Sequence, residues 1–335
     1  MVDLVRRPRS LQPRRGRREL CMSAFAYQPG ATVPFRDRAE IARCRTIPRD
    51  RIADHPSPDF KITVVPDEDL VHIWLGDMFA RIQAARDAGE SCVMLLPNPW
   101  PGYRNLARMI NRAQLSCHHC WFFAMDEYAD ENGRVAPEDW PRGFTYALLR
   151  FLWEEIDPHL RPPREQVFGP NNGNLDHYQD LMDAVGGLDI SYTGPGWTGH
   201  LAFVEPDAPE FGGDRDVDLE EWMQMGTRIC TLSPYTLAQN ALHGSMGFSG
   251  DLAAVPPKAA TIGPREVVSA KHRIDMAGIG VAGTATSWQR TIARLCYHGP
   301  VTPKLPTSIH QRLRTDCLIT ESIAADIEDT WDVGY

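Results

Sequence analysis

Short apolar runs alternate along the chain with longer segments in which apolar residues recur every three or four positions. The runs CVMLL (92–96) and CWFFAM (120–125) are typical of strands that are buried on both faces. Between Pro66 and Gly89, acidic residues followed by a single apolar stripe predict a helix. Because strands that alternate with helices are joined by crossover connections, the pattern predicts a mostly parallel sheet.

The same pattern predicts the remaining elements. Strands are expected at 188–194, 259–263, 273–280 and 316–320. Helices are expected at 103–115, 144–156, 175–187, 234–243, 287–299 and 321–329. The predicted fold class is α/β, with a mostly parallel Rossmann-like sheet, helices on both faces of that sheet and an irregular N-terminal extension.

Three regions of the chain differ in character. Residues 1–22 carry seven arginines against Asp3 and Glu19 and lack the apolar core of a secretory signal. They predict a basic disordered leader, although a basic arm or a transit peptide would show the same charge. Residues 23–65 are rich in proline and arginine without a sustained period and predict an irregular extension. Residues 66–335 predict a single α/β domain.

Composition excludes several classes of protein. The chain has 335 residues, 43% of them hydrophobic and 24% charged, which excludes a disordered or low-complexity chain. No run of about 18 apolar residues occurs, and the net charge of −9 argues against a nucleic-acid binder. The eight irregularly spaced cysteines are typical of reduced thiols. We therefore expect a cytoplasmic protein with no membrane or nucleic-acid partner, and a homo-oligomer is left open.

Candidate chemistry is expected where the strands end, because ligands of parallel α/β sheets bind at the carboxyl ends of strands. Asp126 and Glu127 follow the run at 120–125 directly. Adjacent side chains there point in different directions. One carboxylate can therefore face a pocket while the other caps a loop or a helix.

A second candidate site follows the strand at 188–194, in the stretch GPGWTGHLAFVEP. Its three glycines allow the backbone to approach a ligand closely. His200 follows them at once, and Glu205 lies further along the same stretch. A histidine held by a carboxylate is the usual arrangement for proton transfer near neutral pH. A loop histidine in water would show the same spacing.

Together, MDEY and GPGWTGHLAFVEP resemble the glucosamine-6-phosphate isomerase/deaminase family, which has MDEY and GxGxDGHIAFNEP elements. NNGNLDHYQDLMDAVGGLDISYTG, SWQRTIARLCYHG and DCLITESIAAD are similar to further segments of that family, so the resemblance covers about 80–329. It implies that Asp126 is the base that moves a proton between sugar carbons. It also implies that His200 assists opening of the sugar ring and that Glu205 is its carboxylate partner, which would raise the imidazole pKa.

Several anion-binding positions of the family are changed. Thr198 stands where the family has the DGH aspartate, Gln289 where it has a lysine, and Leu242 near a phosphate-binding arginine. The segment Leu96–Gly102 replaces a glycine-rich phosphate loop with one whose prolines lack N–H donors. These changes argue against phosphate recognition of the family's kind.

Other groups are expected to bind the substrate instead. Trp100 offers a flat apolar face for a sugar ring. Arg104 and Arg290 are either substitute cations or solvated helix residues. The residues expected to bind substrate are Asn98, Trp100, Gly102, Arg104, Glu127, Gly196, Thr198, Gly199, Gln289 and Arg290.

Two further motifs are weak. Residues 278–283 fit GxGxxG after a strand, but no acidic residue follows at the spacing that dinucleotide binding requires. Cys117-His118-His119-Cys120 looks like a metal motif, but consecutive residues that enter a strand alternate in direction and no second pair of ligands follows. We therefore expect neither a metal nor an organic cofactor.

The leading hypothesis is a glucosamine-6-phosphate deaminase-like enzyme with an altered sugar substrate, in which Asp126, His200 and Glu205 are catalytic. A 6-phosphogluconolactonase-like hydrolase, which shares the fold and the GH histidine, is the second hypothesis. A non-catalytic sugar-binding or regulatory protein is the third, and Thr198 is its best support.

Overall fold

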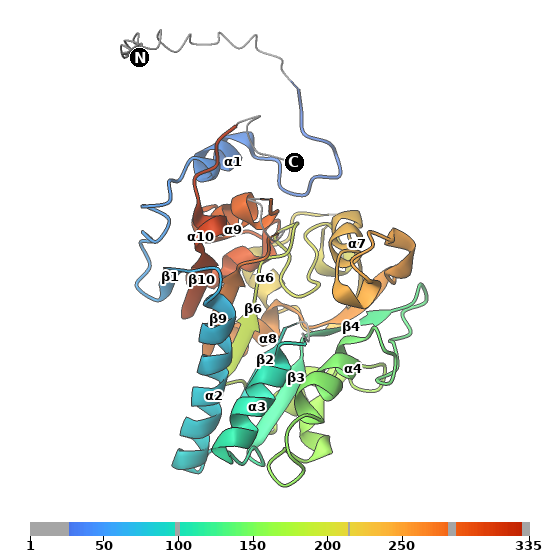
Figure 1. Ribbon diagram of the computed structural model, residues 1–335. Helices are drawn as coiled ribbons and strands as arrows, with labels where there is room; N and C mark the ends of the chain where they lie inside the picture. Colours follow the sequence, from blue (N-terminus) through green and yellow to red (C-terminus); the bar gives the residue numbers. More distant parts are fainter. Residues whose placement is uncertain (1–26, 98–100, 214, 281–285, 330–335) are drawn as a thin grey trace, which may run out of the picture. The chain divides into compact units, whose positions relative to one another are not determined.

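Figure 1 shows the computed structural model of the chain, which describes residues 27–97, 101–213, 215–280 and 286–329. The predicted leader at 1–22 lies outside these residues. The chain divides into two compact units, Met1–Thr32 and Val33–Tyr335. The described residues of the first unit, 27–32, form only loop and turn. All helices and strands named below belong to the second unit.

A seven-stranded sheet forms the centre of the second unit. In order across the sheet, its strands are β1 (Phe60–Val65), β10 (Thr315–Thr320), β9 (His272–Ala277), β6 (Ile190–Thr193), β2 (Cys92–Leu96), β3 (Cys120–Ala124) and β5 (Val167–Phe168). Every neighbouring pair is parallel. Every residue of β2 is buried, as its uninterrupted apolar run predicts. The predicted fold class is confirmed.

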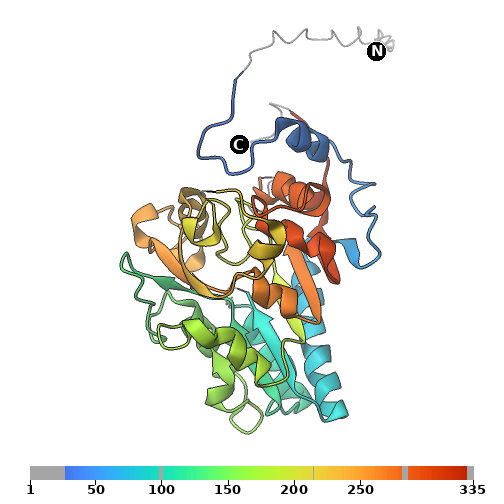
Figure 2. The ribbon, with the colours of Figure 1, turned by 180° about the vertical axis from the view of Figure 1, so that it is seen from behind.

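Helices cover both faces of this sheet, which Figures 1 and 2 show from opposite sides. Met94 of β2 packs in a cluster with α2 (Leu70–Ala88) and α3 (Tyr103–Ala113). The preceding residue, Val93, packs in a different cluster with α5 (Tyr178–Asp183). Successive residues of a strand point to opposite faces, so the two clusters lie on opposite sides of the sheet.

The remaining helices are shorter than α2. They are α1 (Arg38–Arg45), α4 (Phe144–Leu148), α6 (Leu219–Met223), α7 (Pro234–Asn240), α8 (Pro264–Ser269), α9 (Gln289–His298) and α10 (Glu321–Ala324). The helix predicted at 144–156 consists of α4 and a π-helical turn at Leu149–Trp153. The terminal helix predicted at 321–329 ends at Ala324.

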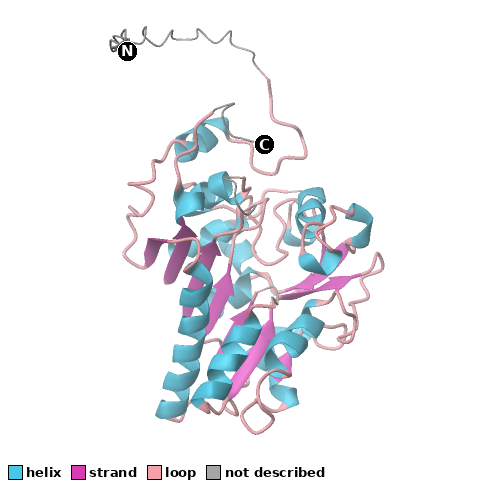
Figure 3. Cartoon of the chain, viewed as in Figure 1, coloured by secondary structure: helices cyan, strands magenta, loops and turns pink. Residues whose placement is uncertain are grey.

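A second sheet of three antiparallel strands adjoins the first (Figure 3). Its order is β4 (Asp126–Ala129), β8 (Lys258–Thr261) and β7 (Arg228–Thr231). The strand predicted at 259–263 is therefore present, but in this sheet rather than in the parallel one, because a short apolar run does not reveal its partner or direction. Met125 links the sheets: its N–H donates to the Leu96 carbonyl (3.0 Å), and its carbonyl accepts from the Ile262 N–H (2.8 Å).

The range predicted as an irregular extension, 23–65, contains regular structure. Phe60–Val65 form the edge strand β1, which pairs with β10 along its whole length. Buried and exposed residues alternate over most of β1, so it has no continuous apolar run, and the proline- and charge-rich residues before it mask the alternation. The domain boundary predicted at residue 66 therefore removes one strand from the sheet.

The parallel order of the main sheet brings two predicted sites to one edge. β6 and β3 are the two neighbours of β2, so Gly194 and Asp126, which follow their carboxyl ends, lie on either side of it. Within the described residues, no helix has both the length and the apolar character needed to cross a bilayer.

Candidate active site

Asp126 is the first residue of β4 and follows the buried strand β3 after one residue. Its side chain is buried, with 4% of the residue exposed. Burial raises the pKa of this carboxyl well above its ordinary range, and the negative charge of Glu127 raises it further. A carboxylate with a raised pKa is suited to taking up and returning a proton near neutral pH.

The neighbouring carboxylate, Glu127, has a structural role. Its Oε1 accepts from the backbone N–H groups of Tyr128 (2.9 Å) and Phe144 (3.0 Å), and its Oε2 accepts from that of Thr145 (2.7 Å). Two of these donors are the first residues of α4, so Glu127 caps that helix. The sequence predicted that one carboxylate of the pair would act as a cap. The further expectation that Glu127 binds substrate stays a prediction, because three backbone donors do not use all the acceptor positions of a carboxylate.

The loop after β6 is shaped to hold the imidazole of His200. A Cβ atom on Gly196 would lie 1.8 Å from His200 Nε2, so only glycine fits beneath the ring. Gly199 has a φ of +79°, in the left-handed region that favours glycine. Its N–H donates to the Gly196 carbonyl (2.9 Å) and closes the turn. Gly196 and Gly199, which were expected to bind substrate, therefore shape the loop around His200.

His200 reaches Glu205 through a threonine. Thr198 Oγ1 lies 3.0 Å from His200 Nδ1 and donates to Glu205 Oε2 at 3.1 Å. The direct separation of His200 Nδ1 and Glu205 Oε2 is 3.5 Å, longer than an ordinary hydrogen bond. All three residues are buried, and Ser233 N–H holds the other carboxylate oxygen at 3.3 Å. The predicted His200–Glu205 pair is thus present, with the Thr198 hydroxyl as a bridge.

Hydroxyl groups surround one nitrogen of the His200 imidazole. In the arrangement where Thr198 donates its hydroxyl proton to Glu205, its oxygen is left to accept from the imidazole, with the proton on Nδ1. The hydroxyl of Thr236, in α7, lies 3.0 Å from the same nitrogen. Nε2, on the other side of the ring above Gly196, is then the nitrogen that can accept a proton. Thr198 orients His200 instead of binding substrate, and Thr236 is a member of the site that the sequence did not reveal.

Residues of the second sheet connect the surroundings of Asp126 and His200. Asp126 pairs with Thr261 of β8, whose hydroxyl accepts from the Phe203 N–H at 3.0 Å. The Phe203 ring lies 6.2 Å from the His200 ring and 6.0 Å from the Tyr128 ring. The Phe203 ring thus joins the His200 ring, in one cluster of packed groups, to Tyr128, which lies two residues after Asp126.

Three further polar residues of this cluster were not predicted. The Tyr128 hydroxyl and both polar atoms of the Asn240 side chain are buried and have no hydrogen-bond partner among the described residues, and the two side chains are neighbours. Burial and the nearby His200 lower the pKa of His243 to about 4, which keeps that imidazole neutral at physiological pH. Asn240 and His243 belong to α7 and the turn after it, a region where the sequence shows no motif.

The expected cation positions hold structural residues. Gln289 is fully buried, accepts from the Ile279 N–H (2.7 Å) and donates to the Pro195 carbonyl (2.9 Å). Arg104 pairs with Glu155 and lies over the Phe151 ring of the π-helical turn. These contacts give Gln289 and Arg104 partners within the chain, and the expectation that they bind substrate stays a prediction.

Arg290 also has a local role: it donates to the carbonyls of Ala325 and Asp326, just beyond α10. Leu242, near the expected arginine position, is 48% exposed. The structure therefore does not bring Arg104 and Arg290 together as a substitute cation pair.

Some expectations fall partly or wholly outside the described residues. Asn98 and Trp100 lie outside the described residues. Gly102, the N-cap residue of α3, is the only expected ligand in the segment Leu96–Gly102 that is described. The GxGxxG stretch at 278–283 is described only to Gly280. Cys117 and Cys120 are buried free thiols, and the described residues hold no group of three or more His, Cys, Asp or Glu side chains that could hold a metal ion.

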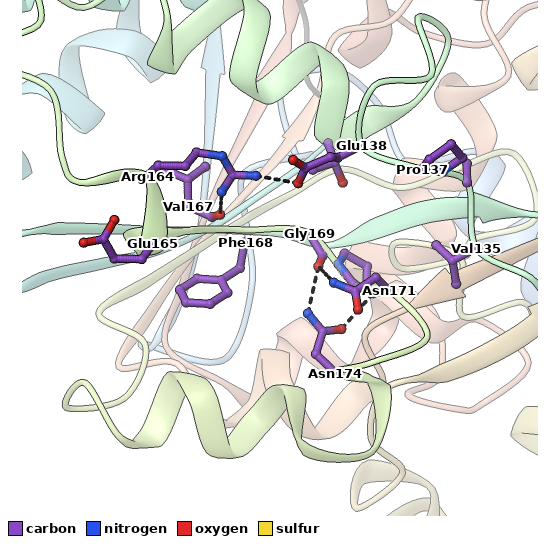
Figure 4. Close-up of a pocket in the computed structure, with 13 residues that line it drawn as sticks. Val135, Pro137, Glu138, Arg164, Glu165, Val167, Phe168, Gly169, Asn171 and Asn174 are labelled. Carbon is purple, nitrogen blue, oxygen red and sulfur yellow. Dashed lines mark hydrogen bonds and ion pairs between the residues drawn. The ribbon is translucent and has the colours of Figure 1, made fainter.

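A cavity of about 420 Å³ lies beside the short strand β5, away from the candidate catalytic residues (Figure 4). Neither Asp126 nor His200 lines it. Arg164 on its wall pairs with Glu138 and donates to the Val167 carbonyl, and Asn174 donates to the Gly169 carbonyl. Because these polar groups bond to one another, the cavity gives no independent sign of a ligand.

The fold is shared with sugar-phosphate enzymes. A monomeric glucosamine-6-phosphate deaminase superposes with a TM-score of 0.62 at 21% identity, over 79% of this chain and 98% of its own. The 6-phosphogluconolactonase from Trypanosoma cruzi superposes with a TM-score of 0.53 at 15% identity, over 79% of this chain and 95% of its own. The chain therefore has the α/β fold common to these deaminases and lactonases.

Relatives found by sequence include glucosamine-6-phosphate deaminases. The glucosamine-6-phosphate deaminase of Porphyromonas gingivalis is 29% identical over 221 residues, covering 63% of this chain and 75% of that protein. That of Parabacteroides distasonis is 27% identical over 227 residues, covering 64% and 74%. No family model matches the chain. The resemblance that the motifs predicted is confirmed: the chain is a divergent relative of the glucosamine-6-phosphate deaminases, which are enzymes.

Proposed function

We propose that the chain is a sugar isomerase or deaminase that acts on an amino sugar or a related sugar by acid/base catalysis. The buried His200–Thr198–Glu205 relay carries this proposal, together with the buried Asp126 at the same edge of the sheet. An imidazole backed by a carboxylate and a second carboxyl with a raised pKa are the groups that sugar isomerisation needs. The deaminase names of the sequence relatives support the same class.

The first proposed step opens the sugar ring. His200 Nε2 takes the proton from the hydroxyl on C1, and the same proton passes to the ring oxygen as the bond between that oxygen and C1 breaks. An aldehyde forms at C1, and no proton is gained or lost. Glu205 stabilises the transient imidazolium through the Thr198 hydroxyl, which accepts from Nδ1 throughout.

The second proposed step moves a proton between carbons. Ionised Asp126 removes the proton from C2, the bonding pair forms a C1–C2 double bond, and the former aldehyde oxygen takes a proton from solvent to give an enol. Asp126 then returns its proton to C1. With an amino group on C2 the product is an iminium cation, which water hydrolyses to a ketone and ammonia with release of one proton to solvent. With a hydroxyl on C2, that hydroxyl releases its proton to solvent as C1 is protonated, and the product is the ketose.

The proposed substrate carries no phosphate at the position that the deaminase family recognises. Gln289 is buried and bonded to the backbone, and Arg104 and Arg290 bond to groups of the chain itself. A phosphate dianion without such cations would lose charge-assisted hydrogen bonds worth about 1.5–3 kcal/mol each. We therefore expect an unphosphorylated sugar, or one that carries its anion elsewhere.

Ammonia release and ketose formation from a panel of amino sugars, each with and without a 6-phosphate, test this function. We expect turnover of at least one unphosphorylated amino sugar, and its loss in Asp126→Asn. We also expect a lower rate in Glu205→Gln, because the relay loses its charge. Efficient turnover of glucosamine 6-phosphate with competitive inhibition by inorganic phosphate would contradict the substrate assignment. Absence of turnover across the panel would favour a non-catalytic sugar-binding role.

A 6-phosphogluconolactonase-like hydrolase is the second candidate, because the lactonases share the fold and His200 could activate a water molecule. Asp126 separates the two reactions, since lactone hydrolysis requires no proton transfer between carbons. Lactone hydrolysis that persists in Asp126→Asn and is lost in His200→Gln would favour the hydrolase.

A further inference from the structure

The loop that carries His200 also presents an aromatic side chain to solvent. Trp197 lies within the glycine loop and is 42% exposed. Its ring stacks on that of Trp288, the residue before α9, with a centroid separation of 5.6 Å and an interplanar angle of 21°. We call Trp197 and Trp288 the tryptophan pair. Through Trp197, the pair of stacked indoles is thus attached to the loop that carries the candidate catalytic histidine.

Two buried amides hold this pair in place. The Trp197 N–H donates to Gln239 Oε1 at 2.8 Å, and Gln239 is 6% exposed. On the other side, fully buried Gln289 follows Trp288 and donates to the Pro195 carbonyl at 2.9 Å. Both tryptophans are therefore attached to anchored backbone, so stacking of a ligand on them would cost little conformational entropy.

The surroundings of the pair are apolar instead of cationic. Ile279, whose N–H is held by Gln289, is 48% exposed. Leu242, whose N–H donates to the Gln239 carbonyl (3.2 Å), is also 48% exposed. Arg290, the cation nearest in sequence, donates to carbonyls beyond α10. Exposed apolar side chains whose backbone is held by the same two glutamines are typical of an interaction site, and they favour an uncharged partner.

We infer that the tryptophan pair is a stacking subsite for a second, uncharged sugar ring, joined to the sugar whose reducing end reacts at His200. The inference rests on the proposed function and names its substrate class as an oligosaccharide of amino sugars. An indole face matches the C–H face of a pyranose, and the half-exposed Trp197 ring offers such a face. The second ring would occupy the end of the site where the family binds phosphate.

Calorimetric titration of the full chain with glucosamine and with its β-1,4- and β-1,6-linked disaccharides tests the inference. We expect at least one disaccharide to bind about tenfold more tightly than glucosamine, equivalent to about 1.4 kcal/mol. Trp197→Ala should reduce this preference to about twofold, and Trp197→Phe should retain part of it because a ring remains. Ile73→Ala, which removes an exposed apolar side chain from α2, is the matched control and should keep the preference.

Three results would overturn the inference. The first is that both disaccharides bind no more tightly than glucosamine, and the second is that Trp197→Ala weakens glucosamine and disaccharide binding equally. In either case turnover of glucosamine would leave the proposed function standing. The third result is that none of the three sugars binds, which would remove this subsite, whereas the proposed function would still be decided by the wider panel of amino sugars.

Discussion

Two groups of residues that the sequence assigned to one site are used differently by the fold. Asp126, His200 and Glu205 are buried, and the Thr198 hydroxyl lies between the histidine and the glutamate. We call these the proton-transfer residues. Gln289 and Arg290 stand at or beside the lysine position of the family, and both are bonded to backbone. We call these two, with Leu242 and Arg104, the anion positions.

The difference between the proton-transfer residues and the anion positions indicates which part of the site the chemistry of the reaction constrains. Proton transfer requires particular groups in particular protonation states, and the chain retains them even where Thr198 replaces a carboxylate. Anion binding requires only that donors converge, and here the corresponding side chains support loops and helix ends instead. Under the proposed function, the chain keeps the reaction type of its relatives while its substrate changes, and the two groups should then respond differently to mutation.

The largest effect is expected for Asp126→Asn, which keeps the shape of the side chain and removes the base. Turnover of the amino sugar should fall by about 10²–10⁴-fold, the usual contribution of a general base. Steady-state rates and binding of the same sugar should be measured together. A fall in rate without a matching loss of binding would identify a catalytic role, whereas unchanged turnover would remove Asp126 from the mechanism.

A similarly large effect is expected for Gly196→Ala, because the added Cβ would overlap His200 Nε2. Displacement of the imidazole by about 1 Å should lower turnover by roughly 100-fold. Gly76→Ala is the matched control, since a Cβ at that position in α2 meets nothing within 4 Å and alanine favours helix. Equal activities of the two variants would show that the loop does not position His200 for catalysis.

A moderate effect is expected at the relay. Thr198→Val removes the hydroxyl between His200 and Glu205 with little change in volume, and turnover should fall about tenfold because a buried acceptor loses its donor. Thr198→Ser keeps the hydroxyl and should restore most of the rate. A serine variant as slow as the valine variant would mean that the threonine methyl, rather than the bridge, is what matters.

The pH dependence should report the raised pKa of Asp126. A base must be ionised to act, so the rate should fall as pH falls through its pKa. Burial and Glu127 shift that pKa upward, so the acidic limb of the profile should lie above the ordinary carboxyl value of about 4. The profile of kcat/KM for the unphosphorylated sugar measures this directly. An acidic limb at or below the ordinary value would show that a different group is the base.

The smallest effect on substrate choice is expected at the anion positions. Gln289→Lys restores the family's residue type but loses the carbonyl oxygen that accepts from Ile279 N–H. We expect no gain in turnover of glucosamine 6-phosphate and a marked loss of stability in thermal unfolding, because the lysine charge would be buried without a partner. A gain of tenfold or more would show that this position still faces a phosphate and would break the contrast between the two groups of residues.

The sequence predicted the elements with strong periodicity and the residues with a motif. The fully apolar run at 92–96 coincides with β2, and the two motifs identified Asp126, His200 and Glu205. Edge strand β1 was missed because its alternation is short and lies beside proline-rich sequence. The antiparallel partnership of β4 and β8 was missed because strand pairing depends on contacts distant in sequence.

The structural roles of several expected ligands could not be read from the sequence either. Glu127 became a cap and Gln289 a support because their partners, α4 and the Pro195 and Ile279 backbone, are brought near only by folding. Thr236 and Asn240 have no motif around them and reach the site through the position of α7. Residue type thus indicated the chemistry, whereas the tertiary structure decided which polar residues remain free for a ligand.

The most direct test of the central claim is exchange of the C2 proton of unphosphorylated glucosamine with deuterated water, followed by NMR. Removal and return of a proton by a carboxylate allows exchange with solvent, so the native chain should incorporate deuterium into the sugar or its ketose product. Asp126→Asn should abolish the incorporation, and the Gly76→Ala control should not. Incorporation at the same rate in native chain and Asp126→Asn, or incorporation only into glucosamine 6-phosphate, would contradict the account.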